Sequence, residues 1–172
     1  MSGPVSGARL RAGVDTASLA DWEPSSDARA RLLEEVEGRA RYAPFCDRVA
    51  KLFALAPRVV MAALESLPDA RWEPSEFDGI ELLAITAGPT AGDAQVGFMR
   101  GRPGARLPSH THGGAEHMLM LEGRVLEDDG TPLAPGGEAH RRPGQPHGFV
   151  VAGDEPCVCA YRFAGGVHVI GR

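Results

Sequence analysis

The sequence predicts a mainly β protein: an antiparallel jelly-roll barrel with a short N-terminal helical extension. Two patterns support this fold class. From Gly79 onward, short segments follow the period of two that strands require, and turns rich in Gly, Pro and Asp separate them. Strands this short at this spacing are typical of an antiparallel sandwich or barrel. Before Gly79, apolar residues recur every three or four positions, as they do in amphipathic helices.

Three short helices are expected before the barrel. The first begins after capping residues at 25–27 and ends near Gly38, the second begins near Pro44, and the third runs from Pro57 to Pro68. Their apolar stripes are Leu32, Leu33 and Val36 in the first, Phe45, Val49, Leu52, Phe53 and Ala56 in the second, and Val60, Leu64 and Leu67 in the third. Stripes this narrow do not make a strong core alone, so the helices should pack on the barrel or on a partner.

The strand-like segments would together form one barrel. They are GIELLAIT, AQVGFMR, ARLPSHTH, HMLMLEG, RVLEDD, EAHRR, HGFVVAG, CVCAYRF and VHVI. Residues 1–24 are rich in Gly, Ser and Ala without a clear period, and we expect a flexible tail there. The expected organisation is therefore a tail at 1–24, a helical extension at 25–75 and a barrel at 76–172.

Charge and hydropathy exclude several classes of protein. The net charge of −5 argues against a nucleic-acid binder, because binding to phosphates needs clustered cations. The chain has no run of about 18 apolar residues, the length that a membrane helix needs, and its first residues lack the apolar core of a signal peptide. We therefore expect a cytoplasmic protein in which Cys46, Cys157 and Cys159 are free thiols and serve as small buried apolar residues.

The histidines carry the strongest functional signal. All six lie between His110 and His168. In a strand, residues two apart point to the same face, so His110 and His112 can direct two imidazoles at one point. Glu116 follows across a short turn and can close on the same point, and His147 comes later in the chain. Three nitrogens and one oxygen suit one divalent ion of Zn, Fe, Mn, Ni or Cu, and the ligand set does not choose among them.

The residues around these four ligands resemble the two motifs of the cupin family. The segment GARLPSHTHGGAEHMLMLEG, from Gly104 to Gly123, fits the first motif, G-x5-H-x-H-x3-E-x6-G. The segment GGEAHRRPGQPHGFVV fits the second motif, G-x5-P-x-G-x2-H-x3-N, except that Arg142 stands at the proline position and Val151 at the asparagine position. Neither position is a ligand in the family. The resemblance implies a cupin-type jelly-roll barrel that holds a metal through the three histidines and the glutamate.

A finer resemblance, to the ChrR-like cupins, covers about residues 41–171. It rests on RYAPFCDRVAKLFAL before the barrel, RWEPSEFDGIELL leading into it, and EPCVCAYRFAGGVHVIG near its end. The name-giving members are anti-sigma factors, in which a zinc-binding helical domain grips a sigma factor and the cupin-like domain is needed for the response to singlet oxygen. The resemblance thus implies a sensing or regulatory role, with a sigma factor as partner.

The zinc motif of that helical domain, H-x3-C-x2-C, is absent from this sequence. No histidine precedes His110, and Cys46 is the one cysteine in that part of the chain. We therefore expect one metal per chain, bound within residues 104–151. His140 and His168 are expected to lie outside this site.

Apolar residues in phase with the metal ligands should line the inside of the barrel. They are Met118 and Met120, in phase with Glu116, Phe149, in phase with His147, and Tyr161, in phase with Cys157 and Cys159. Such a wall is suited to a packed core and equally to a pocket for a small molecule.

The opposite face of the segment HMLMLEG carries His117, Leu119 and Leu121. An exposed apolar row on a sheet tends to find a partner, and cupins commonly pair through a sheet face. We therefore expect a homodimer.

Three functions stay open on these observations. The first is a regulatory module that responds to an oxidant or small molecule at the metal. The second is a metal-dependent enzyme, such as an Fe or Mn dioxygenase whose free coordination positions bind substrate and O2. The third is a structural zinc site without chemistry. No separate acid, base or substrate-binding motif identifies a catalytic residue.

Overall fold

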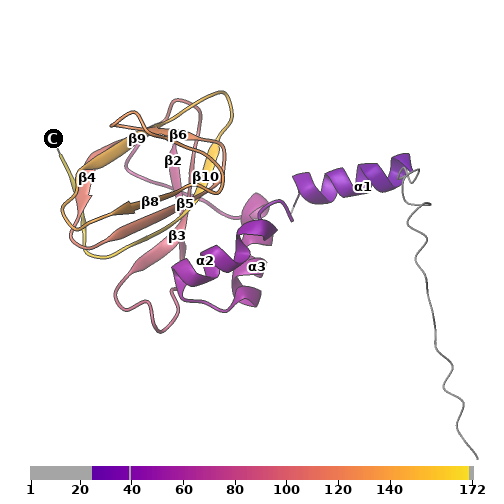
Figure 1. Cartoon of the computed structure of the whole chain (residues 1–172), viewed down its shortest axis with the longest axis horizontal. Helices are drawn as coiled ribbons and strands as arrows, with labels where there is room; N and C mark the ends of the chain where they lie inside the picture. Colours follow the sequence, from indigo (N-terminus) through magenta and orange to yellow (C-terminus); the bar gives the residue numbers. More distant parts are fainter. Residues whose placement is uncertain (1–24, 39, 171–172) are drawn as a thin grey trace, which may run out of the picture.

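Two antiparallel β-sheets face each other and form the body of the molecule (Figure 1). The computed structural model describes residues 25–38 and 40–170. The six-stranded sheet has the order β1-β2-β3-β10-β5-β8, and the five-stranded sheet has the order β11-β4-β9-β6-β7. The strands are β1 (Glu73–Pro74), β2 (Ile80–Ile85), β3 (Gln95–Gly101), β4 (Arg106–His112), β5 (Glu116–Glu122), β6 (Val125–Glu127), β7 (Pro132–Leu133), β8 (Glu138–Arg141), β9 (His147–Val151), β10 (Cys157–Phe163) and β11 (Val167–Val169). The mainly β, jelly-roll class predicted from the strand periodicity is confirmed.

Two of these strands were not predicted. The short strand β1 pairs with β2, so the six-stranded sheet begins before the expected boundary at residue 76. The other, β7, pairs with β6 at the edge of the second sheet. Both have only two residues, too few for an alternating pattern to be visible in the sequence.

Three α-helices precede the sheets in the part of the chain that the structure describes. They are α1 (Ser26–Glu37), α2 (Cys46–Phe53) and α3 (Pro57–Ser66), and short 3₁₀ turns at Ala43–Phe45 and Leu67–Asp69 precede α2 and follow α3. Ser25 caps α1, because its side chain accepts a hydrogen bond of 3.2 Å from the backbone N–H of Ala28. No helix among the described residues is long and apolar enough to cross a membrane.

The first helix stands apart from the barrel and from the other two helices (Figure 1). Leu33, one of its predicted stripe residues, is 49% exposed. The side chains of Leu32 and Val36 and the tail predicted at 1–24 lie outside what the structure describes.

Helices α2 and α3 pack on the outer face of the six-stranded sheet, which is one of the two arrangements expected from their narrow stripes. Phe53 of α2 meets Phe98 of β3 edge to face, with ring centroids 5.1 Å apart. Leu119 and Leu121 of β5 belong to the same buried cluster and are 1% and 4% exposed. The expectation that these two leucines form an exposed row is therefore wrong, because the chain's own helices cover them. The homodimer loses the support of that row and stays a prediction.

A second core fills the space between the two sheets. It includes the thiols Cys157 and Cys159, both fully buried and free, as predicted. Val151, at the asparagine position of the second cupin motif, is buried in this core, and its backbone N–H donates to the carbonyl of Ala105. The departure from the motif thus leaves the strand pairing of β9 intact.

Candidate metal centre

Four side chains from three strands converge inside the barrel. His110 and His112 come from β4, Glu116 begins β5 and His147 begins β9. The structure brings together all four residues that the motif spacing indicated, since one ligand atom of each lies within 4.8 Å of the others. Both β4 histidines are buried, 3% and 5% exposed.

Local backbone features place these four residues. His110 and His147 are directly paired across β4 and β9, next to an irregularity in the pairing that follows Leu107. The turn between β4 and β5 contains Gly114, where a Cβ atom would lie 2.8 Å from the carbonyl oxygen of Ala164. A glycine is therefore required for the close approach that lets the chain return from β4 to β5.

Hydrogen bonds to the backbone orient two of the imidazoles. His110 Nδ1 lies 2.9 Å from the carbonyl oxygen of Pro108, and His147 Nδ1 lies 3.1 Å from that of Gln145. A carbonyl only accepts, so each Nδ1 carries a proton and, in the neutral ring, each Nε2 presents a lone pair. This pattern, in which the remote nitrogen is fixed by a backbone carbonyl, is typical of metal-binding histidines.

The inward-facing atoms satisfy one another poorly without a cation. His110 Nε2 lies 3.1 Å from His112 Nε2, and His147 Nε2 lies 2.6 Å from Glu116 Oε2. Even so, His147 Nε2 is buried and lacks the geometry of a hydrogen bond. His112 meets the group through Nε2, and its other nitrogen, Nδ1, is buried without a hydrogen-bond partner among the described residues. Converging lone pairs and a carboxylate are what a divalent transition ion neutralises, so the donor set fits such an ion.

The pKa shifts of Glu116 and His110 favour the protonation states of metal ligands, an ionised carboxylate and a neutral imidazole. Burial raises the pKa of Glu116, but its contacts with His112 and His147 outweigh burial and lower the pKa to about 2. Burial lowers the pKa of His110. Burial also acts to lower the pKa of His147, yet the neighbouring Glu116 carboxylate prevails and raises it. Glu116 is thus ionised at neutral pH, as a metal ligand must be.

A cavity of about 330 Å³ opens onto His110, His112 and Glu116. Met118, Phe149 and Tyr161 line it, where phase predicted them. Met120 was also predicted to line the pocket; it is fully buried in the interior core and does not border the cavity.

Sequence reasoning missed other residues of the cavity wall, most clearly Phe163. Its ring packs against His112, with centroids 4.6 Å apart, and stacks on Tyr161 at 5.6 Å. Phe163 stands two residues after Tyr161, so the alternation that placed Tyr161 inside the barrel could have found it too. Phe77 and Val167 lie in loops or near strand ends, where no phase argument applies.

A family model described as the ChrR cupin-like domain matches residues 61–159, more than half of the chain. The chain belongs to the ChrR cupin-like domain family. The matched range contains all four donors, begins within α3 and ends within β10. No curated protein matches the chain in sequence.

Solved structures show the same fold at low sequence identity. The complex of SigE with the anti-sigma factor ChrR from Rhodobacter sphaeroides matches at 17% identity over 95% of this chain and 71% of that chain, with a TM-score of 0.51. The polyketide cyclase RemF from Streptomyces resistomycificus matches at 19% identity over 61% of this chain and 82% of that one, also with a TM-score of 0.51. A cupin-like protein from Thermotoga maritima matches at 21% identity over 59% and 85%, with a TM-score of 0.51. These likenesses place the ChrR cupin-like domain of this chain in the cupin fold.

Proposed function

We propose that this protein is a metal-dependent sensing or regulatory module. Its barrel would hold one divalent transition ion through His110, His112, Glu116 and His147, and its helices would respond to the state of that site. The observation that carries the proposal is the position of β5 between the metal donors and the helices.

Strand β5 faces both parts of the molecule. Its first residue, Glu116, is one of the four donors and points to the histidines inside the barrel. Leu119 and Leu121 point outward into the core shared with α2 and α3. Because β5 is a single strand buried between two cores, a displacement of the Glu116 carboxylate shifts the surface on which the helices rest. A bound ion supplies charge neutralisation of the donors and open coordination positions for a small ligand or an oxidant.

The proposed partner class is a sigma factor. Two findings support it: membership of the ChrR cupin-like family, and the structural match to the SigE–ChrR complex, which spans the helices as well as the barrel. Helix α1 stands apart from the barrel (Figure 1), and its described side chains are exposed and available for such a contact.

Hydrogen exchange of the full chain tests the regulatory proposal. Metal-loaded and metal-stripped protein should differ in the exchange of amides in α2, α3 and the adjoining part of β5. Strands β6 and β7 carry no donor and serve as the internal reference. Equal exchange of the helices in both forms, in protein that binds the ion, would refute sensing through the helices and favour a structural zinc site.

A second candidate function is small-molecule chemistry at the metal. The observation that favours it is the cavity of about 330 Å³, which has mostly apolar walls and borders three of the four donors. A metal-dependent enzyme of the dioxygenase type would need such a space for its substrate. An oxygen-uptake screen of Fe- and Mn-loaded protein with small organic substrates tests it, and uptake that vanishes in Tyr161→Leu would support a substrate bound in this cavity.

A further inference from the structure

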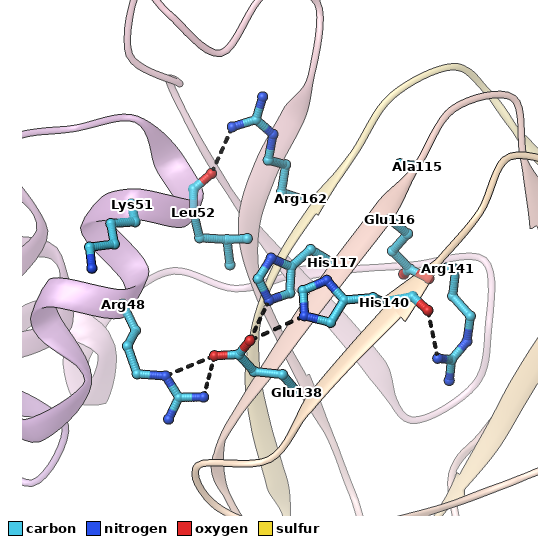
Figure 2. A pocket seen from close by; sticks show the side chains of 10 residues that line it. All are labelled: Arg48, Lys51, Leu52, Ala115, Glu116, His117, Glu138, His140, Arg141 and Arg162. Atoms are coloured by element: carbon cyan, nitrogen blue, oxygen red, sulfur yellow. Dashed lines mark hydrogen bonds and ion pairs between the residues drawn. The ribbon is translucent and has the colours of Figure 1, made fainter.

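A second group of possible metal donors lies on the outer face of the barrel, away from the four-residue site. His117 lies on β5, and Glu138 and His140 lie on β8. Each offers one ligand atom, and these three atoms lie within 4.8 Å of one another. Figure 2 shows both imidazoles directed at the Glu138 carboxylate, with helix α2 on the other side of that carboxylate.

Strand pairing, rather than nearness in sequence, assembles this group. His117 is directly opposite His140 in the antiparallel pairing of β5 with β8, and Glu138 is opposite Leu119. The two imidazoles therefore lie side by side, with ring centroids 3.8 Å apart. Because the side chains of a strand alternate, His117 points outward while its neighbour Glu116 points to the interior site.

The distances within the group match those within a coordination shell. His117 Nε2 lies 3.0 Å and His140 Nε2 lies 3.2 Å from the same atom, Glu138 Oε2. Bonds of about 2.0–2.2 Å to a common ion, at angles between octahedral and tetrahedral, separate neighbouring donors by roughly 2.9–3.5 Å. Two imidazoles and a carboxylate thus need little movement to bind one ion.

The other oxygen of the Glu138 carboxylate, Oε1, pairs with Arg48 of α2. Arg48 Nε donates a hydrogen bond of 2.8 Å to Glu138 Oε1, and its Nη2 donates one of 2.7 Å to the carbonyl of Gly136. The guanidinium and the imidazoles therefore use different oxygens of the same carboxylate. A cation on Oε2 and Arg48 on Oε1 can coexist, but their like charges repel each other.

We propose that His117, Glu138 and His140 form a second site for a borderline divalent cation such as Zn²⁺ or Co²⁺, whose affinity is linked to the Arg48–Glu138 contact. Its affinity is lower than that of the interior site, since it has three protein donors and the His140 side chain is 65% exposed. Linkage is reciprocal: Arg48 weakens the binding of the ion, and the ion weakens the contact that ties α2 to β8. The sequence predicted one ion per chain, and this site adds a second, weaker one.

Metal titration of the full chain tests the proposal. Co²⁺ is added to protein that retains its tightly bound ion, and stoichiometry is followed by equilibrium dialysis and visible absorption. One further equivalent is expected, and the double variant His117→Ala/His140→Ala should lose it while it keeps the tight ion. The control variant His168→Ala, which removes an exposed histidine outside both groups, should keep both. Arg48→Gln should bind the second equivalent at least about fivefold more tightly.

The outcomes separate the second site from the first. Absence of a further equivalent, or its persistence in the double variant, overturns the second site. Equal loss in His168→Ala overturns it as well, since binding would then be nonspecific. Unchanged affinity in Arg48→Gln overturns the linkage to α2. A His110→Ala/His112→Ala variant that loses the tight ion but keeps the weaker one shows that the two sites are independent, and failure at the interior site alone leaves this inference standing.

Discussion

The orientation of individual side chains decides what the interior site can bind. His110 and His147 are fixed by backbone carbonyls at Nδ1, so their Nε2 atoms point toward the other donors. Preorganisation of this kind lowers the entropic cost of binding, because the imidazoles need no reorientation. Affinity should therefore depend strongly on each of the four donors.

The substitution His112→Ala tests this dependence. It removes one of three nitrogen donors and the neighbour that helps to keep Glu116 ionised. We expect a loss of metal affinity of more than roughly 100-fold, the upper end of the cost of losing an outer-shell partner. Metal analysis after competition with a chelator measures it, with His168→Ala as control. Unchanged affinity and stoichiometry in His112→Ala would show that the ion binds elsewhere.

The two tyrosines of the chain give a prediction about pH. Burial raises the pKa of both Tyr42 and Tyr161 above the ordinary value of about 10. The folded state therefore favours the protonated phenols, and their contribution to stability is fully present below about pH 10 and is lost as pH rises through the raised values. The ultraviolet absorbance of tyrosinate should show both phenols protonated at a pH where the guanidinium-unfolded chain has already ionised. Coincident titration curves would contradict the burial of both residues.

At the scale of elements, the main apolar contact outside the barrel interior is the packing of α2 against the six-stranded sheet. Phe53 is fully buried and meets Phe98 edge to face. The α2 residues Arg48 and Leu52 border the second donor group on the same side of the sheet (Figure 2). The helices thus contribute both to the core and to the surroundings of that group.

The substitution Phe53→Ala measures how much this contact contributes to the stability of the fold. Loss of a fully buried aromatic side chain should lower the free energy of unfolding by about 3–5 kcal/mol, since a cavity remains in its place. Val59→Ala on α3 is the control, because Val59 is 46% exposed and its truncation should change stability by no more than about 0.5 kcal/mol. Urea unfolding followed by circular dichroism gives both values. Similar effects of the two substitutions would mean that α2 does not share a cooperative core with the sheet.

The sequence predicted the parts of the structure that depend on local spacing. The strand periodicity indicated the sheets, and the intervals between His110, His112 and Glu116 indicated one interior cluster, because two-residue alternation and a short turn determine where these side chains point. Phase likewise placed Met118 beside the cluster. The sequence could not show that Met120 lies beyond the reach of the cavity. Strand phase indicates which face a side chain lies on, but it does not indicate how deep the cavity extends.

Contacts between segments that are far apart in the chain could not be predicted from the sequence. The pattern of HMLMLEG showed an outward apolar row at Leu119 and Leu121, but an apolar row predicts only that something covers it, whether a second copy or the chain's own helices. In the same way, strand alternation indicated that His117 lies on the outward face, and His140 was expected outside the interior site. Their pairing depends on the register of β5 with β8, which the length of the intervening chain does not determine.

At the scale of the molecule, residues 25–38 and 40–170 form a barrel with helices packed on one sheet, while helix α1 stands apart (Figure 1). Residues 40–72 supply the helices that close the outer face of the six-stranded sheet, whereas α1 shows no buried residue among its described side chains. Helices α2 and α3 should therefore contribute to the stability of the barrel. Helix α1 should contribute little to it and can serve another role.

Two truncations test this division. Removal of residues 1–38, which takes away α1, should leave the midpoint of thermal unfolding nearly unchanged, because the described α1 side chains bury no core surface. Removal of residues 1–71 should make the protein strongly destabilised or aggregated, since it exposes Phe98, Leu119 and Leu121, which are at most 4% exposed in the full chain. Thermal unfolding and light scattering measure both effects. A monomeric 72–172 fragment with the stability of the full chain would show that the barrel does not need its helical cover, and it would remove the physical basis for communication between the metal donors and the helices.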